Sequence, residues 1–169
     1  MSTLFTFPNP VNEVSARLVA GGVVILSVLT IALQQPWLLI PLAYGFVARV
    51  LTGPTLSPLG QLVTRVLTPN LPFKEKLVAG PPKRFAQGIG ATLSVSALIL
   101  HFGFGVTTAA YVLVGFIVIA ATLESVFAFC LGCQVFAVLM SFGVVPEEVC
   151  ERCNNIWADA PTRLVRPSP

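Results

Sequence analysis

The chain alternates long apolar runs with short polar connections, a pattern typical of helices packed inside a lipid bilayer. A helix that crosses a bilayer needs about 20 mostly apolar residues. Four runs meet or approach this length. We therefore predict an all-α integral membrane protein, a four-helix bundle with short cytoplasmic or interfacial helices. The expected spans, within a single membrane domain over residues 1–169, are about 16–34, 37–51, 85–104 and 107–130.

The fourth apolar run is too long for one span. As one continuous helix, residues 107–145 would extend roughly 55 Å, whereas the hydrocarbon core is about 30 Å thick. The helix must therefore break, tilt strongly or leave the membrane, and Gly132 is the expected hinge. We expect the span to end near Cys130 and residues 131–169 to form a cytoplasmic segment that carries the cysteines.

The connection between the second and third spans, residues 52–84, holds six prolines and five basic residues. Within it, residues 58–67 repeat apolar positions with helical spacing, so that one face collects Leu59, Leu62, Val63, Val66 and Leu67. This pattern predicts a short amphipathic helix on the membrane surface within a cytoplasmic loop. A plain connector is the alternative.

The composition supports lipid as the main surroundings of the chain. Apolar residues make up 55% of the sequence and charged residues 10%, whereas a soluble domain carries about 25% charged residues. Basic residues form no stripe with interleaved aromatic residues, which argues against a nucleic-acid partner. Membrane lipids are the first expected partner.

The distribution of positive charge predicts the orientation. All ten Lys and Arg residues fall in the N-terminal segment, in the 52–84 loop or its edges, or in the C-terminal segment. The two opposite turns, 34–36 and 101–105, contain none. The excess of positive charge marks the cytoplasmic side. We therefore expect both termini in the cytoplasm, where a permanent disulfide is rare.

All four cysteines fall in two pairs with the same spacing: Cys130, Cys133, Cys150 and Cys153. Residues three apart share a helix face, which suits either a reversible disulfide or a metal ion held between two thiolates. The full spacing also resembles that of a zinc ribbon, with all four cysteines as metal ligands. The first pair lies in apolar sequence without the turn-rich knuckles of a ribbon, which favours thiol chemistry. Purely packing cysteines are a further alternative.

Glu124 is the one carboxylate inside a predicted span. An ionisable group at such a depth is a candidate functional residue. A structural ion pair with Arg17 or Arg49 is one interpretation. The other is proton transfer to or from the thiol of Cys130 or Cys133.

Three segments carry a resemblance: "SPLGQL" (57–62), "PPKRFAQGIG" (81–90) and "FCLGC" (129–133). They resemble a bacterial membrane family catalogued as domain of unknown function 4395, from the first span through the fourth. Members are often encoded beside thioredoxin-like and sulfurtransferase proteins. The resemblance therefore implies a role in thiol or sulfur chemistry, without supplying a mechanism.

These observations predict a multi-pass protein of the bacterial inner membrane that exchanges disulfides or relays sulfur through two cytoplasmic CxxC pairs. Its reactive residues would be Cys130, Cys133, Cys150, Cys153 and Glu124, with no cofactor. A thioredoxin-like protein, a sulfurtransferase or a larger membrane complex would be its partner. The alternative is a small accessory subunit of a membrane complex, with zinc or packing cysteines. Whether the chain is an enzyme stays open.

Overall fold

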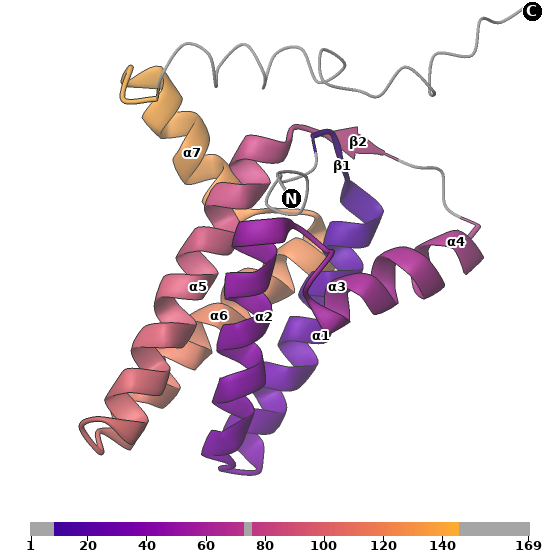
Figure 1. Ribbon diagram of the computed structural model, residues 1–169. Helices are drawn as coiled ribbons and strands as arrows, with labels where there is room; N and C mark the ends of the chain where they lie inside the picture. The colour runs from indigo at the N-terminus through magenta and orange to yellow at the C-terminus, as the bar shows by residue number, and fades with distance from the viewer. Residues whose placement is uncertain (1–8, 73–75, 146–169) are drawn as a thin grey trace, which may run out of the picture.

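A computed structural model describes residues 9–72 and 76–145. These residues are mostly helical (Figure 1), which confirms the all-α prediction. The helices are α1 (Glu13–Ala32), the 3-10 turn η1 (Pro36–Leu38), α2 (Leu39–Thr52), α3 (Pro58–Leu62), the π-helical turn η2 (Val63–Leu67), α4 (Thr68–Asn70), α5 (Gly80–Phe102), α6 (Thr107–Phe127) and α7 (Leu131–Ser141). Two short strands, β1 (Val11–Asn12) and β2 (Leu77–Val78), pair antiparallel.

Helices α1, α2, α5 and α6 form the bundle (Figure 1), with α1 against α6, α2 against α5, and α5 against α6. The core between them combines aliphatic and aromatic side chains with several alanines. Small residues let helix backbones approach closely, which is the usual way that helices pack inside lipid. The buried core residues are Ala20, Val23, Leu39, Leu42, Phe46, Ala97, Ala110, Val114, Ile117 and Ala121.

The outer surface of the bundle is apolar. Within residues 9–72 and 76–145, three helices are long and apolar enough to cross a membrane: α1, α5 and α6. The segment Pro36–Thr52, which joins η1 to α2, is apolar but shorter. Large hydrophobic side chains such as Ile25, Leu33 and Phe116 lie exposed on the outside. Length and composition therefore indicate a membrane-spanning chain, since water would not favour such a surface.

The two ends of the bundle differ in character. The turn between α1 and η1 and the turn between α5 and α6 lie at one end (Figure 1) and contain no Lys or Arg. The opposite end carries β1, β2 and the ion pair between Lys76 Nζ and Glu13 Oε2, 2.7 Å apart. The backbone N–H of Glu13 also donates to the Lys76 carbonyl. These contacts connect the start of α1 to the segment before α5.

The predicted amphipathic helix over 58–67 is helical but irregular. The apolar residues of this segment do not all face the same surroundings. Val63 is buried, and Leu59 packs against Gly22 of α1, where it fills the space that a side chain at Gly22 would need. Leu62 and Val66 stay exposed. The helix forms a π turn just before Pro69. Proline has no backbone N–H, so the α-helical hydrogen bond from position 69 to the Arg65 carbonyl cannot form.

The long fourth run breaks at Ala128, which has a left-handed backbone with φ +57°. Helix α6 ends there, and α7 begins three residues later and packs against the first turns of α5 (Figure 1). The expected hinge at Gly132 was wrong. Gly132 is a buried helical residue that permits close approach, because a Cβ on it would lie 2.5 Å from Ala86 Cα. The rings of Phe85 and Phe136 complete this contact, with centroids 5.5 Å apart.

The contact between α5 and α7 yields a prediction. Gly132→Ala should lower the free energy of unfolding by about 1–3 kcal/mol, because the new methyl group overlaps the backbone at Ala86. Helix propensity alone would give the opposite sign. The control is Gly88→Ala, where a Cβ meets nothing within 4 Å. Thermal unfolding of the purified variants in detergent measures the difference, and equal stability of the two would contradict the packing described.

Candidate functional site

The first cysteine pair lies at the start of α7, just beyond the end of α6. Cys130 occupies the N-cap position with an extended backbone, and Cys133 lies in the first turn. Both thiols are free; Cys130 is 7% exposed and Cys133 is partly buried. The amide groups at a helix N-terminus favour negative charge, so this position stabilises a thiolate. We call these two residues the thiol pair.

The two members of the thiol pair differ in acidity. The Cys133 thiol, as a hydrogen-bond donor, is the main reason that the pKa of Cys130 is lowered, and the Lys83 ammonium adds to this effect. Burial and the Glu124 carboxylate act in the opposite direction. The pKa of Cys133 is raised, first by its hydrogen bond to Cys130 and then by burial. Of the two thiols, Cys130 therefore loses its proton more readily.

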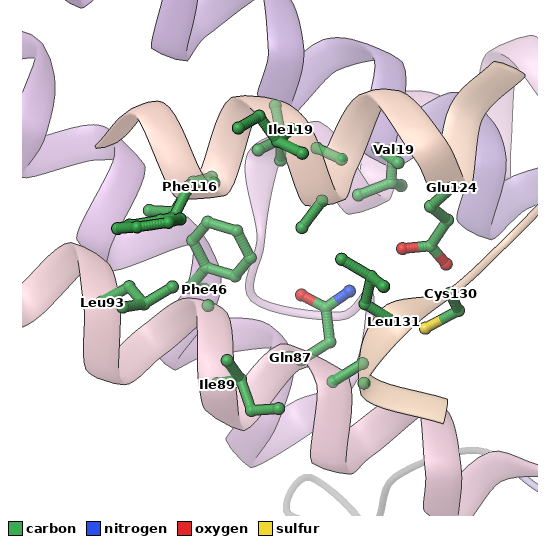
Figure 2. A pocket seen from close by; sticks show the side chains of 18 of the residues that line it. Val19, Phe46, Gln87, Ile89, Leu93, Phe116, Ile119, Glu124, Cys130 and Leu131 are labelled. Carbon is green, nitrogen blue, oxygen red and sulfur yellow. The ribbon is translucent and has the colours of Figure 1, made fainter. Parts of the chain in front are cut away.

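An ion pair lies beside the thiol pair. Lys83 Nζ, in the first turn of α5, is 2.6 Å from Glu124 Oε1, in the last turn of α6. The two side chains are 11% and 13% exposed. The expected pairing of Glu124 with Arg17 or Arg49 was wrong, because α5 starts early enough to bring Lys83 level with Glu124. Figure 2 shows the Glu124 carboxylate on the same side of the cavity as Cys130.

Arg17 binds backbone oxygens instead. Its Nε and Nη2 atoms donate to the Ser125 carbonyl at 3.2 and 3.1 Å, and Nη2 also donates to the Val126 carbonyl at 3.1 Å. These carbonyls belong to the last turn of α6, where the helix has no further N–H groups to offer. Arg17 on α1 thus supplies hydrogen-bond donors to the last carbonyls of α6. These bonds fix the end of α6, which leads into the thiol pair.

Arg49 is buried, with 5% of its surface exposed, and bridges three elements. Its Nε donates to Gln87 Oε1 on α5 at 2.9 Å, and its Nη1 donates to Ser57 Oγ before α3 at 3.3 Å. Its guanidinium also lies 4.7 Å from the ring centroid of Phe46. These contacts fix the position of Arg49 and, through it, the orientation of the Gln87 amide.

Lys83 was missed as a site residue because the third span was expected to start at Phe85. Gln87 lies inside that expected span and was missed because its partner Arg49 is 38 residues away. The sequence does contain a signal for the earlier start. Pro81 and Pro82 occupy the first positions of α5, where proline is favoured because its missing N–H has no partner there in any case. Moving the start to Gly80 places Lys83 in the first helical turn.

Cys130 of the thiol pair lines a cavity of about 350 Å³ between α1, α2, α5, α6 and α7. Cys130, Glu124 and Gln87 line one end (Figure 2). The rest of the lining is almost entirely apolar. It includes Val19, Val23, Phe46, Leu93, Phe116, Ile119 and Val135.

No group of three or more metal-ligating side chains converges within residues 9–72 and 76–145. The second pair, Cys150 and Cys153, lies outside the described residues. The two-pair arrangement and the four-cysteine zinc site therefore stay predictions.

Comparison with known families confirms the resemblance. The family described as "Domain of unknown function (DUF4395)" matches residues 11–141. The matched region includes Arg49, Lys83, Glu124 and the thiol pair. No curated protein and no solved structure matches the chain significantly.

The ion pair yields a prediction. Lys83→Met should cost about 3–5 kcal/mol of stability, because it leaves the Glu124 carboxylate buried without its partner charge. The double variant Lys83→Met with Glu124→Leu should recover most of this loss, since no unpaired charge remains. Denaturant unfolding in detergent measures both.

The control is Arg65→Met on η2. Arg65 is exposed and makes no ion pair within the described residues, so its loss should cost at most about 0.5 kcal/mol. A double variant as unstable as Lys83→Met alone would show that Lys83 and Glu124 are not energetically coupled.

Proposed function

Because the chain belongs to the domain of unknown function 4395 family, whose description assigns no activity, we propose a function from the geometry of its own residues. The protein is a membrane-anchored thiol–disulfide exchange protein, and the thiol pair is its reactive group. The observation that carries this proposal is the position of Cys130 at the N-cap of α7, with Cys133 one turn away as a free thiol. Thiol–disulfide exchange requires such a thiolate with a neighbouring second thiol.

The exchange runs in two steps. The Cys130 thiolate attacks one sulfur of a partner's disulfide, forms a mixed disulfide with it and releases the other partner sulfur as a thiolate. Cys133 then loses its proton and attacks the Cys130 sulfur. This step forms the Cys130–Cys133 disulfide and releases the second partner sulfur. The partner's disulfide is reduced by two electrons and the thiol pair is oxidised by two; with a dithiol partner, the same steps run in reverse.

The ion pair supports this chemistry from the neighbouring helices. Lys83 places a positive charge near the thiolate of Cys130, which it stabilises. Glu124 lines the same cavity end and is the acid–base group for the proton that Cys133 gives up. Both groups lie near the ends of long helices that pack directly against each other. The reactive residues are therefore held by the bundle itself.

We also propose four spans in the bacterial plasma membrane, with both termini in the cytoplasm. Arg17, Lys76, Lys83 and Arg84 all belong to the end of the bundle that carries the thiol pair, and the opposite turns have no Lys or Arg. The positive-inside rule then puts the thiol pair at the cytoplasmic surface. Its partner there is a thioredoxin-like or sulfurtransferase protein. The second cysteine pair, on the C-terminal segment, would pass electrons between that partner and Cys133.

A trapping experiment tests the proposal. In a background that lacks Cys150 and Cys153, Cys133→Ser should accumulate a mixed disulfide at Cys130, because the second step is blocked. Cys130→Ser should accumulate about tenfold less, since burial still raises the pKa of Cys133 and Cys133 lacks the N-cap position of Cys130. Non-reducing gels of membranes quenched with acid and alkylated afterwards measure both adducts.

Three outcomes would contradict the proposal. The first is equal trapping by both variants, and the second is trapping by neither. The third is one zinc ion per full-length chain, lost on Cys130→Ser, in elemental analysis; this result would favour the accessory subunit with a four-cysteine site.

A further inference from the structure

The cavity beside the thiol pair has two chemically different parts. Cys130, Glu124 and Gln87 form a polar end, and the remainder is apolar. Phe116 lies two turns before Glu124 on α6, so the apolar part extends about 12 Å from the polar end toward the middle of the span. In Figure 2, Phe46, Leu93 and Phe116 gather at the end of the cavity away from Glu124 and Cys130.

The rim of the apolar part lies on the outer surface of the bundle. Phe116 and Ile119 line the cavity and are nevertheless 56% and 57% exposed. Ile89 on α5 and Val135 on α7 are rim residues of the same kind. Because α5 and α6 have the length and composition of membrane spans, this surface faces hydrocarbon. The cavity therefore takes its occupant from the bilayer.

The polar end offers a hydrogen-bond donor in a fixed orientation. Arg49 donates to Gln87 Oε1, which assigns the oxygen of this amide to Arg49 and leaves the Nε2 hydrogens for another acceptor. Within the described part of the chain, Gln87 Nε2 makes no hydrogen bond. Glu124 at the same end disfavours an anionic group. The site thus selects an uncharged head with an acceptor oxygen, attached to an apolar body.

We infer that this cavity binds the ring of a lipid-soluble quinone, with one ring carbonyl accepting from Gln87 Nε2 beside Cys130 and the tail leaving past Phe116 into the bilayer. A quinone is uncharged, carries acceptor carbonyls and is supplied by the membrane. The volume of about 350 Å³ lies within the range of roughly 300–1,000 Å³ usual for small-molecule sites. It fits a substituted ring and the beginning of a tail.

The consequence for electron flow rests on the proposed function. A cytoplasmic dithiol reduces the Cys130–Cys133 disulfide by exchange. The Cys130 thiolate and the Cys133 thiol then give two electrons to the quinone: the S–H bond of Cys133 breaks, one S–S bond forms, and the quinone becomes the quinol with the proton of Cys133 and one proton from water. The protein would thereby connect cytoplasmic thiols to the quinone pool of the membrane.

Binding is tested first, independently of thiol chemistry. Decylubiquinone is titrated into the full chain in lipid nanodiscs that contain no quinone, and binding is measured by calorimetry. About one molecule per chain should bind. Ala120→Phe, which fills the cavity, should abolish binding, and Gln87→Leu should weaken it about tenfold through loss of the donor. The control is Val112→Phe, an exposed position on α6 outside the cavity, which should bind like the wild type.

The outcomes separate this inference from the proposed function. In the background that lacks Cys150 and Cys153, binding should persist in Cys133→Ser, because Cys133 does not line the cavity. Reduced protein with both Cys130 and Cys133 should convert bound quinone to quinol, seen as loss of the quinone absorbance, and Cys133→Ser should not. Binding without quinol formation would overturn the electron path but not the site. No binding by the wild type, equal binding by Ala120→Phe, or a cavity that holds only phospholipid in native mass spectrometry would overturn the site, whatever the trapping experiment shows.

Discussion

The arrangement of the site depends on the ion pair between Lys83 and Glu124. It joins the first turn of α5 to the last turn of α6 across 2.6 Å, in surroundings where either charge alone would be unfavourable. Because each charge requires the other, the pair fixes the register of the two helices at this end of the bundle. Arg17 adds a second restraint by donating to the final carbonyls of α6. The chain therefore leaves α6 from a fixed point and reaches Cys130 directly.

The thiol pair lies at the boundary between two kinds of surroundings. On one side is the charged end of the bundle, with Lys76, Lys83 and Arg84. On the other is the apolar cavity that reaches toward the middle of the spans. Close packing of Gly132 on Ala86 lets α7 lie against α5 between these two regions, with its N-terminal amides beside Cys130. Cys130 itself is 7% exposed and lines the cavity, whereas Cys133 is partly buried.

Sequence alone predicted the features that lipid imposes and missed those that depend on side-chain packing. The length of the apolar runs indicated an all-α fold and a break near Cys130, because a longer helix would exceed the bilayer. The place of the break was missed because the left-handed residue is Ala128, which has no intrinsic preference for that conformation. The pairing of Lys83 with Glu124 was missed because the third span was expected to start at Phe85, whereas α5 starts at Gly80. The hydrogen bond from Arg49 to Gln87 joins residues 38 apart in the sequence, and no local sequence pattern predicts it.

The most direct measurement is the redox titration of the thiol pair in a membrane. The variant lacking Cys150 and Cys153 would be equilibrated in nanodiscs against defined ratios of oxidised and reduced glutathione. Its free thiols would then be alkylated, and the mass of the protein would be measured by mass spectrometry. The account predicts that Cys130 and Cys133 lose alkylation together, in one two-electron transition with a slope of about 30 mV per tenfold change in ratio. Independent alkylation of the two thiols at every potential would contradict it.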